Sequence, residues 1–315
     1  MRMILALVVL ACSSARAQQY KVELGPYAVV DVSDTWYDEE RRREIPVRYF
    51  LPVDAEGALP LVVFSHRLGG RNSDYLYLGD HWASYGYAVV FVQHPGSDLA
   101  ASRRKSSGKP AAGDRTDHRI VRVLDIEFVM SEAARRDEIK VDQARIGVGG
   151  QDAGAVAALI TVGARFAISA DGQMEKMPND RVVAALAISP PSGKWGMIDR
   201  SWATIDRPVL WMTGTNDYDQ IMHSPEKRRE GFDGSGGPGQ VLVILNEADH
   251  DSFSDRELPR SPPRKPGYHD DIVSTTTAFW DAHLLGDADA AQWLASDAAI
   301  ESSLQGLEME RRDGE

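Results

Sequence analysis

Cysteine is almost absent from this chain: among 315 residues the only one is Cys12, which lies in the apolar stretch at the N-terminus. Once that stretch is removed, the chain has no thiol that could form a disulfide bond, bind a metal ion or act as a nucleophile. The eight histidines are scattered and include no His-x-x-x-His pair, and no phosphate-binding loop is visible. We therefore predict neither a cofactor nor a metal ion.

Long apolar runs are also missing. The run Ile4–Ala11 is too short to cross a membrane, and no later run is long enough. The flanking Met-Arg-Met and Ser-Ser-Ala-Arg-Ala17 are typical of a secretory signal peptide with an Ala-x-Ala cleavage site. We expect residues 1–17 to be removed and residues 18–315 to form a single secreted or periplasmic domain. Val9-Leu-Ala-Cys12 is lipobox-like, so a lipid anchor at Cys12 is the alternative.

Positive charge is in short supply. The chain has 35 Lys and Arg against 47 Asp and Glu, a formal net charge of -12. Such an acidic chain is not expected to bind nucleic acid or an anionic membrane as its main partner. The local exception is Arg103-Arg-Lys105 with Lys109, in the polar segment 98–117, which we expect to be a mobile, solvated loop.

Strand-like and helix-like patterns alternate along the chain, which predicts an α/β fold with a mostly parallel central sheet and helices on both faces. The tail from Ser302 alternates in charge and is expected to be poorly ordered. The expected strands are 27–32, 45–51, 61–65, 88–92, 146–148, 182–188, 209–212 and 241–245, and the expected helices are 75–85, 118–136, 153–160 and 271–285.

The most informative segment is Arg145-Ile-Gly-Val-Gly-Gly-Gln-Asp-Ala-Gly-Ala155. An apolar strand, a tight glycine turn and a helix of small residues follow one another, which is typical of a nucleophile elbow, Gly-x-nucleophile-x-Gly. Gly150 and Gly154 allow the strand and the helix to approach closely. The reacting position holds Asp152, where a hydrolase usually carries serine. The alternative is an ordinary strand–helix turn with Asp152 as the helix N-cap.

An acid and a histidine follow the elbow in the order that a hydrolase triad requires. Asp217 ends the apolar strand that begins near Pro208, and Asp219 is a second candidate for the acid. His250 follows the strand 240–245. A histidine just past a strand end can reach the elbow while a carboxylate fixes its tautomer. We therefore predict a catalytic set of Asp152, His250 and Asp217.

A turn upstream of the elbow supplies the expected oxyanion hole. The strand 59–65 ends before His66, and Arg67-Leu-Gly-Gly70 follows. In a hydrolase of this build, one N–H comes from this turn and the other from the residue after the nucleophile. The predicted donors are therefore the backbone N–H groups of Leu68 and Ala153.

From about residue 27 to about residue 285, the chain resembles the α/β-hydrolase superfamily. Within it, the sequence is similar to the secreted bacterial branch near dienelactone hydrolases, platelet-activating-factor acetylhydrolases and cutinase-like polyester hydrolases. This resemblance implies an esterase- or lipase-like hydrolase acting on a small-molecule or polymeric ester, with an Asp–His pair behind a serine. The segments that carry it are Phe64–Gly70, Leu78–Val90, Gln93–Asp98, the elbow, Met212–Asp217 and Ala248–His250.

Two residues depart from the family pattern. Asp152 replaces serine at the elbow, and Arg67 replaces the usual glycine after His66. Because the two turns should face each other, we expect an ion pair between Arg67 and Asp152. Two functions then stay open: a hydrolase that uses Asp152, His250 and Asp217, and a catalytically silent homologue in which that ion pair fills the old site and the pocket only binds a ligand.

Asp152 also changes the chemistry that is expected. A carboxylate is a poor nucleophile toward an ester carbonyl but works on a saturated carbon that carries a leaving group, or on an epoxide. Haloalkane dehalogenases and epoxide hydrolases use an elbow aspartate in this way. Those enzymes usually carry a helical cap, for which residues 189–207 are too few. The sequence leaves open whether the substrate is an ester, a halide or an epoxide.

Overall fold

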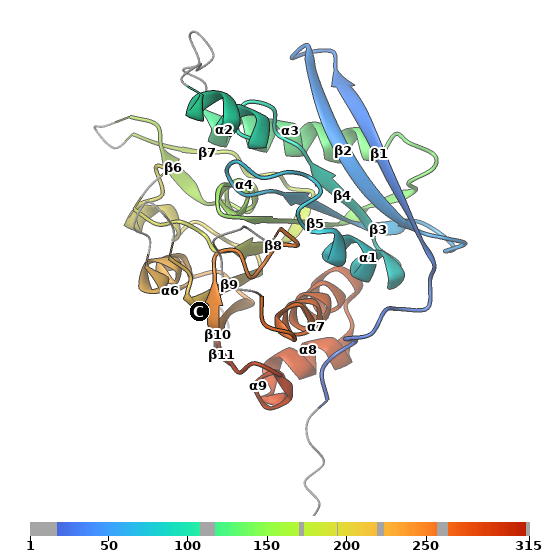
Figure 1. Ribbon diagram of the computed structural model, residues 1–315, viewed down its shortest axis with the longest axis vertical. Helices are drawn as coiled ribbons and strands as arrows, with labels where there is room; N and C mark the ends of the chain where they lie inside the picture. The colour runs from blue at the N-terminus through green and yellow to red at the C-terminus, as the bar shows by residue number, and fades with distance from the viewer. Residues whose placement is uncertain are drawn as a thin grey trace, which may run out of the picture.

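A computed structural model of the chain describes residues 18–107, 117–169, 173–193, 195–218, 224–256 and 264–312. A sheet of nine strands runs through the centre (Figure 1), in the order β1-β2-β4-β3-β5-β8-β9-β10-β11. The strands from β4 to β10 in that order are parallel, whereas β1, β2 and β11 pair antiparallel at the two edges. This confirms the predicted α/β-hydrolase arrangement.

The strands of the central sheet are β1 Val29–Asp38, β2 Arg43–Pro52, β3 Leu59–Ser65, β4 Ala88–Val92, β5 Val141–Gln151, β8 Val182–Ile188, β9 Val209–Asn216, β10 Gln240–Asp249 and β11 Leu307–Arg312. A separate hairpin consists of β6 Arg165–Ala167 and β7 Met174–Lys176. Every residue of β3 and β4 is buried, as expected for strands with both faces covered.

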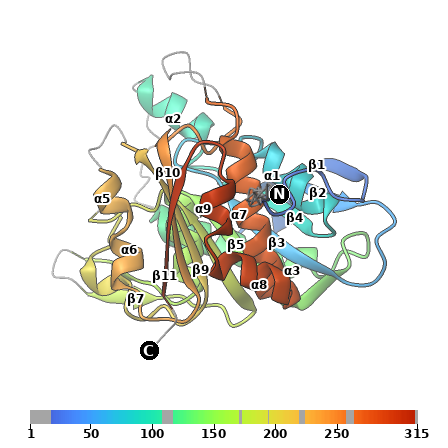
Figure 2. The ribbon, with the colours of Figure 1, turned by 90° about the horizontal axis from the view of Figure 1, so that it is seen from below.

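Helices cover both faces of the sheet (Figures 1 and 2). Apolar side chains of α3 and α4 pack into the core on one face, and those of α1 and α7 pack into the core on the other. The helices are α1 Leu76–Ser84, α2 Leu99–Ser106, α3 His118–Ala133, α4 Ala153–Thr161, α5 Pro225–Arg228, α6 Glu230–Gly234, α7 Tyr268–Trp280, α8 Ala288–Ala295 and α9 Ala298–Ser302, with a π-helical turn at Asp281–Leu285.

Two segments differ from the sequence-based expectation. Helix α2 lies within the predicted loop 98–117, because Asp98 caps it by accepting a hydrogen bond from the N–H of Ala101 and three cations occupy its last turn. Strand β11 lies within the predicted frayed tail and extends the sheet beyond β10. Its alternation of apolar and charged residues, Leu307-Glu-Met-Glu310, suits a strand that is buried on one side. Lys109 lies outside the described residues.

The connection between β8 and β9 is short, and within its described residues it contains only a single 3₁₀ turn, Asp199–Ser201. The expectation that this connection is too short for a helical cap therefore holds for the described part. Among the described residues, no helix is both long and apolar enough to cross a bilayer.

Candidate active site

The elbow predicted from the sequence forms between β5 and α4. Asp152 has a φ of 52°, a left-handed backbone conformation that is costly for a residue with a side chain and recurs at functional sites. A Cβ atom on Gly154 would lie 1.9 Å from the carbonyl oxygen of Ser65, and one on Gly150 would lie 2.3 Å from the carbonyl carbon of Gly154. Only glycine fits at these two positions, so the spacing of the motif has a steric cause.

The acid and the histidine meet beside the elbow because their strands are neighbours. Asn216 on β9 pairs with Asp249 on β10, so the next residues along the two strands, Asp217 and His250, leave the sheet together. The Nδ1 atom of His250 lies 2.9 Å from Oδ1 of Asp217. The predicted pair of Asp217 and His250 is thus in contact, whereas Asp219 lies outside the described residues.

Asp217 is held in its ionised state. Burial alone would raise its pKa, but the hydrogen bond from His250 and the charge of Arg228 outweigh burial and lower the pKa to about 2. Thr213 donates to its other oxygen at 2.8 Å, and Arg228 on α5 lies 3.5 Å from Oδ1. Because an ionised Asp217 only accepts hydrogen bonds, the proton sits on Nδ1 of His250, and Nε2 is the nitrogen that can take a proton from water.

The oxyanion turn meets the elbow, but the group that fills it is Asp152 itself. The N–H of Leu68 donates to Oδ2 of Asp152 at 3.2 Å. Ala153 is the first residue of α4, where a backbone N–H has no acceptor within its own helix. Asp152 is only partly buried, so its carboxylate is accessible from the surface side of the turn.

His66 orients the Leu68 N–H through the intervening peptide group. Its Nε2 accepts from the N–H of His94 at 3.2 Å, so Nδ1 carries the proton and donates to the carbonyl oxygen of Arg67 at 2.6 Å. That carbonyl also accepts from the N–H of Gly70 at 3.0 Å. The C=O of Arg67 and the N–H of Leu68 belong to one trans peptide and point in opposite directions, so fixing the carbonyl inward turns the N–H outward, toward Asp152.

The buried guanidinium of Arg122 also supports the oxyanion turn. Arg122 on α3 is fully buried and donates to the carbonyl oxygen of His66 and to the Ser97 hydroxyl. Burial lowers its pKa to about 10, against the opposing effect of the carboxylates of Asp152 and Asp125. Arg122 therefore stays charged at neutral pH and provides a positive charge close to Asp152.

The prediction of an ion pair between Arg67 and Asp152 is wrong. The guanidinium of Arg67 pairs with Asp251, the residue after His250, and no ion pair joins it to Asp152 in the described part of the chain. The backbone explains the difference, because Asp152 is engaged by the Leu68 N–H while the Arg67 side chain turns toward the loop after β10. Arg67 thus ties the oxyanion turn to the loop after β10, which carries His250 and Asp251, instead of neutralising the charge of Asp152.

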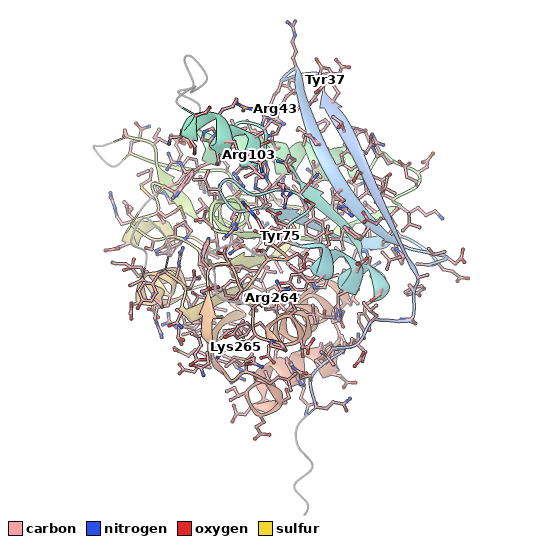
Figure 3. All side chains as sticks on the ribbon, viewed as in Figure 1. Tyr37, Arg43, Tyr75, Arg103, Arg264 and Lys265 are labelled. Atoms are coloured by element: carbon pink, nitrogen blue, oxygen red, sulfur yellow. The ribbon has the colours of Figure 1, made fainter. Side chains whose placement is uncertain are left out.

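A second chain of hydrogen bonds joins the oxyanion turn, the elbow and the loop that carries His250. The N–H of Arg67 donates to the Tyr75 hydroxyl at 3.3 Å, and that hydroxyl donates to the Gln151 side chain at 2.7 Å. Gln151, the residue before the nucleophile position, then donates to the carbonyl oxygen of His250 at 2.6 Å. Tyr75, near the middle of the molecule in Figure 3, is therefore a buried positioning residue and not part of a substrate-facing rim.

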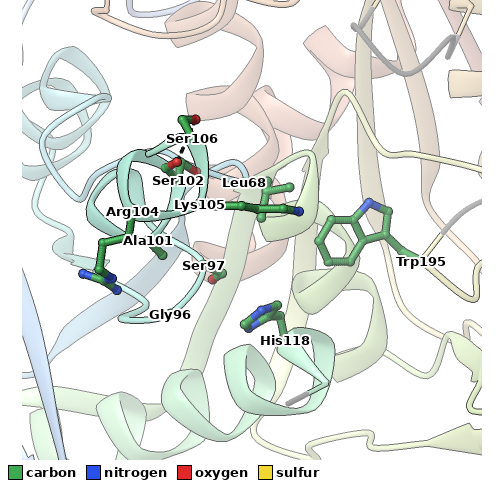
Figure 4. Close-up of a pocket in the computed structure, with 10 residues that line it drawn as sticks. All are labelled: Leu68, Gly96, Ser97, Ala101, Ser102, Arg104, Lys105, Ser106, His118 and Trp195. Carbon is green, nitrogen blue, oxygen red and sulfur yellow. Dashed lines mark hydrogen bonds between the residues drawn. The ribbon is translucent and has the colours of Figure 1, made fainter. Parts of the chain in front are cut away.

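Three other aromatic side chains, those of Tyr77, Trp202 and Trp195, differ in their surroundings. Tyr77 is half-buried and stacks on His269, and Trp202 packs in the core against Trp211. Trp195 lines a cavity that begins at Leu68 (Figure 4). Among the described residues, no group of three or more His, Cys, Asp or Glu is placed to hold a metal ion.

His250 senses the charge of Asp152, and this gives a testable pH dependence. Burial lowers the pKa of His250, but the hydrogen bond and charge of Asp217, with a further contribution from Asp152, raise it above its ordinary value of 6.5. A raised pKa means that the ring becomes a neutral base only at higher pH. We expect Asp152→Asn to lower the His250 midpoint in an NMR titration, and an unchanged midpoint would show that the two side chains do not interact.

Comparison with known proteins agrees with this architecture. A family profile described as "Platelet-activating factor acetylhydrolase, isoform II" matches residues 41–149, which include the oxyanion turn but end before Asp152. No curated protein matches the chain significantly. The match supports an esterase- or lipase-like hydrolase. With the fold, it supports a place for this chain in the α/β-hydrolase superfamily.

Proposed function

We propose that the protein is a hydrolase that uses Asp152 as its nucleophile, with His250 as the general base and Asp217 as the group that orients it. The observation that carries the proposal is the 3.2 Å hydrogen bond from the Leu68 N–H to Oδ2 of Asp152. In an enzyme with a serine nucleophile, that N–H binds the carbonyl oxygen of the substrate. Here an anionic oxygen of the protein already occupies the position.

This occupation suits an attack on saturated carbon. The oxygen Oδ1 of Asp152 forms a bond to the carbon, and the leaving group departs with the electrons of its own bond. The product of this step is an alkyl ester of Asp152, in which Oδ2 is the carbonyl oxygen. That carbonyl oxygen is already hydrogen-bonded to the Leu68 N–H, so the oxyanion hole is assembled for the second step and not for the first.

Water completes the reaction. His250 takes a proton from a water molecule through Nε2, and the hydroxide adds to the side-chain carbonyl carbon of Asp152. Negative charge then develops on Oδ2, where the N–H of Leu68 and the N–H predicted for Ala153 stabilise it. Collapse breaks the bond between that carbon and Oδ1, and the alcohol leaves with a proton returned by His250.

A second candidate function rests on the family profile, whose description names an acetylhydrolase. In that case, His250 would activate water directly against an ester carbonyl, and Asp152 would not form a covalent bond. The carboxylate beside Leu68 counts against this candidate, because it competes with the carbonyl oxygen of an ester for the same N–H. We therefore favour the covalent route through Asp152.

Isotope labelling separates the two candidates. We would treat excess enzyme with 1-bromobutane, styrene oxide or p-nitrophenyl acetate in H₂¹⁸O for a single turnover. The covalent route places the label in the Asp152 carboxylate, because water attacks the protein carbon, and leaves the alcohol unlabelled. Mass spectrometry of the Asp152 peptide and of the product gives both readings. Label in the first-formed product and none in Asp152 would overturn the covalent route and favour direct attack by water.

A further inference from the structure

The cavity beside the oxyanion turn differs in charge from the rest of the molecule. It has a volume of about 580 Å³ and is lined by Leu68, Ser97, Ser102, Lys105, His118 and Trp195, together with Arg104 and small residues. No Asp or Glu is among these lining residues, although the chain as a whole has a net charge of -12. A second surface cavity, of about 770 Å³, is by contrast lined by charges of both signs, with five carboxylates (Asp38, Glu39, Glu40, Glu127 and Glu132) against three arginines (Arg41, Arg135 and Arg181).

Lys105 is the cation that faces into this cavity. In Figure 4, its side chain extends across the space between Leu68 and Trp195, above His118, whereas Arg104 points away from the centre. Within the described ranges, neither Lys105 nor Arg104 forms an ion pair. Among the described acids next to this region, Asp98 caps α2, Asp117 pairs with Arg119, and Asp152 accepts the hydrogen bond from the Leu68 N–H.

The far wall of the cavity is preorganised at a cost in backbone conformation. Trp195 has a φ of 56°, which is rare for a bulky residue, and its carbonyl oxygen accepts from the guanidinium of Arg119 at 2.6 Å. The same guanidinium donates to Ala167 at 2.7 Å. Arg119 therefore holds the backbone of Trp195 at the edge of the cavity, and a strained residue at a cavity wall points to a ligand.

The cavity is also joined to the reaction centre. The N–H of Gly69 donates to the carbonyl oxygen of Ser97 at 2.9 Å, and the Ser97 hydroxyl accepts from Arg122 at 3.0 Å. Leu68 takes part in both places, since its side chain lines the cavity and its N–H binds Asp152. A molecule bound in the cavity would thus lie directly beside the nucleophile.

We infer that this cavity is the subsite for an anionic oxyacid group of the substrate, a carboxylate or a phosphate ester, bound by the ammonium of Lys105 with its carbon chain against Trp195. An ammonium offers three donors to such an anion, and charge-assisted hydrogen bonds are about twice as strong as neutral ones. This deepens the proposed function, because it specifies the substrate as a small electrophile with a negative charge a few atoms from the reacting carbon.

Binding of unreactive ligands tests the subsite without requiring catalysis. We would measure by calorimetry the affinity of butanoate, its neutral isostere butanamide, and propyl phosphate. The expected result is that the anions bind at least about tenfold more tightly than the amide, that Lys105→Gln removes this preference, and that Lys105→Arg keeps it. Lys140→Gln is the matched control, because Lys140 is an exposed lysine at the opposite end of β5.

Each outcome of these binding measurements either supports or overturns the subsite. Equal affinity for butanoate and butanamide, or an anion preference that survives Lys105→Gln, would overturn the subsite. The tighter of butanoate and propyl phosphate identifies the anion. Because 4-bromobutanoate also loses bromide by its own cyclisation, only bromide released above the amount seen with Asp152→Ala is counted. This enzyme-dependent release from 4-bromobutanoate and from 4-bromobutanamide then separates the two proposals. Anion binding without bromide release would leave the subsite in place and remove the proposed function, whereas equal turnover of both bromides without anion binding would do the reverse.

Discussion

His250→Gln is expected to stop the enzyme halfway, with the substrate's carbon attached to Asp152. The first step needs only the carboxylate and an electrophile, and the second needs a base for water. Because the proton of the base sits on Nδ1 and is fixed by Asp217 at 2.9 Å, Nε2 is the proton acceptor that the substitution removes. We expect kcat to fall by about 10³-fold or more and one alkyl group to accumulate per protein molecule.

The readout is the intact mass of the protein and the mass of the peptide that contains Asp152. A rapid first turnover followed by a stalled enzyme is the kinetic signature. The control is the double variant Asp152→Ala with His250→Gln, which should form no adduct, and thermal unfolding verifies that each variant is folded. If His250→Gln consumes substrate without forming an adduct, Asp152 is not the nucleophile.

The sequence predicts best the part of the site that is formed by consecutive residues, the elbow. A strand, a glycine turn and a small-residue helix define the elbow, and the steric reason, a Cβ on Gly154 lying 1.9 Å from the Ser65 carbonyl oxygen, follows from local geometry. The order of Asp217 and His250 is likewise visible, because each follows an apolar strand and the ends of parallel strands meet at one edge of the sheet.

The supporting contacts could not be predicted because their partners are far apart in the chain. Arg122 reaches the oxyanion turn from α3, and the Tyr75–Gln151–His250 connection spans three loops. The predicted ion pair between Arg67 and Asp152 was wrong for the same reason. Opposite charge and expected proximity favoured Asp152, but nothing in the sequence showed that Asp251 would lie within reach or that a backbone N–H would already hold Asp152.

The charged lining of the cavity also depended on structure. Arg103-Arg-Lys105 on its own predicts a solvated loop, and Arg104 and Lys105 become part of the cavity wall only because Asp98 starts a helix there. The strand β11 was missed because charged residues dominate its exposed side, while Leu307 and Met309 pack inward.

Asp152→Ser is expected to convert the site into an ordinary serine esterase. The substitution removes the carboxylate from the Leu68 N–H, which then becomes available to the carbonyl oxygen of an ester. His250 and Asp217 are already arranged to activate a hydroxyl at the elbow. We expect hydrolysis of p-nitrophenyl acetate to exceed that of Asp152→Ala by about 10²-fold or more, while turnover of 1-bromobutane is lost.

The partner substitution Arg67→Gly, which the family pattern suggests, should be left out of this test. Arg67 is buried and paired with Asp251, so its removal would break that ion pair and loosen the tie between the oxyanion turn and the loop that carries His250. The matched control is Asp152→Ser with His250→Ala, which should return ester hydrolysis to the level of Asp152→Ala. A serine variant no better than that alanine variant would mean that the elbow and the base are not in reacting geometry, and it would count equally against a nucleophilic Asp152.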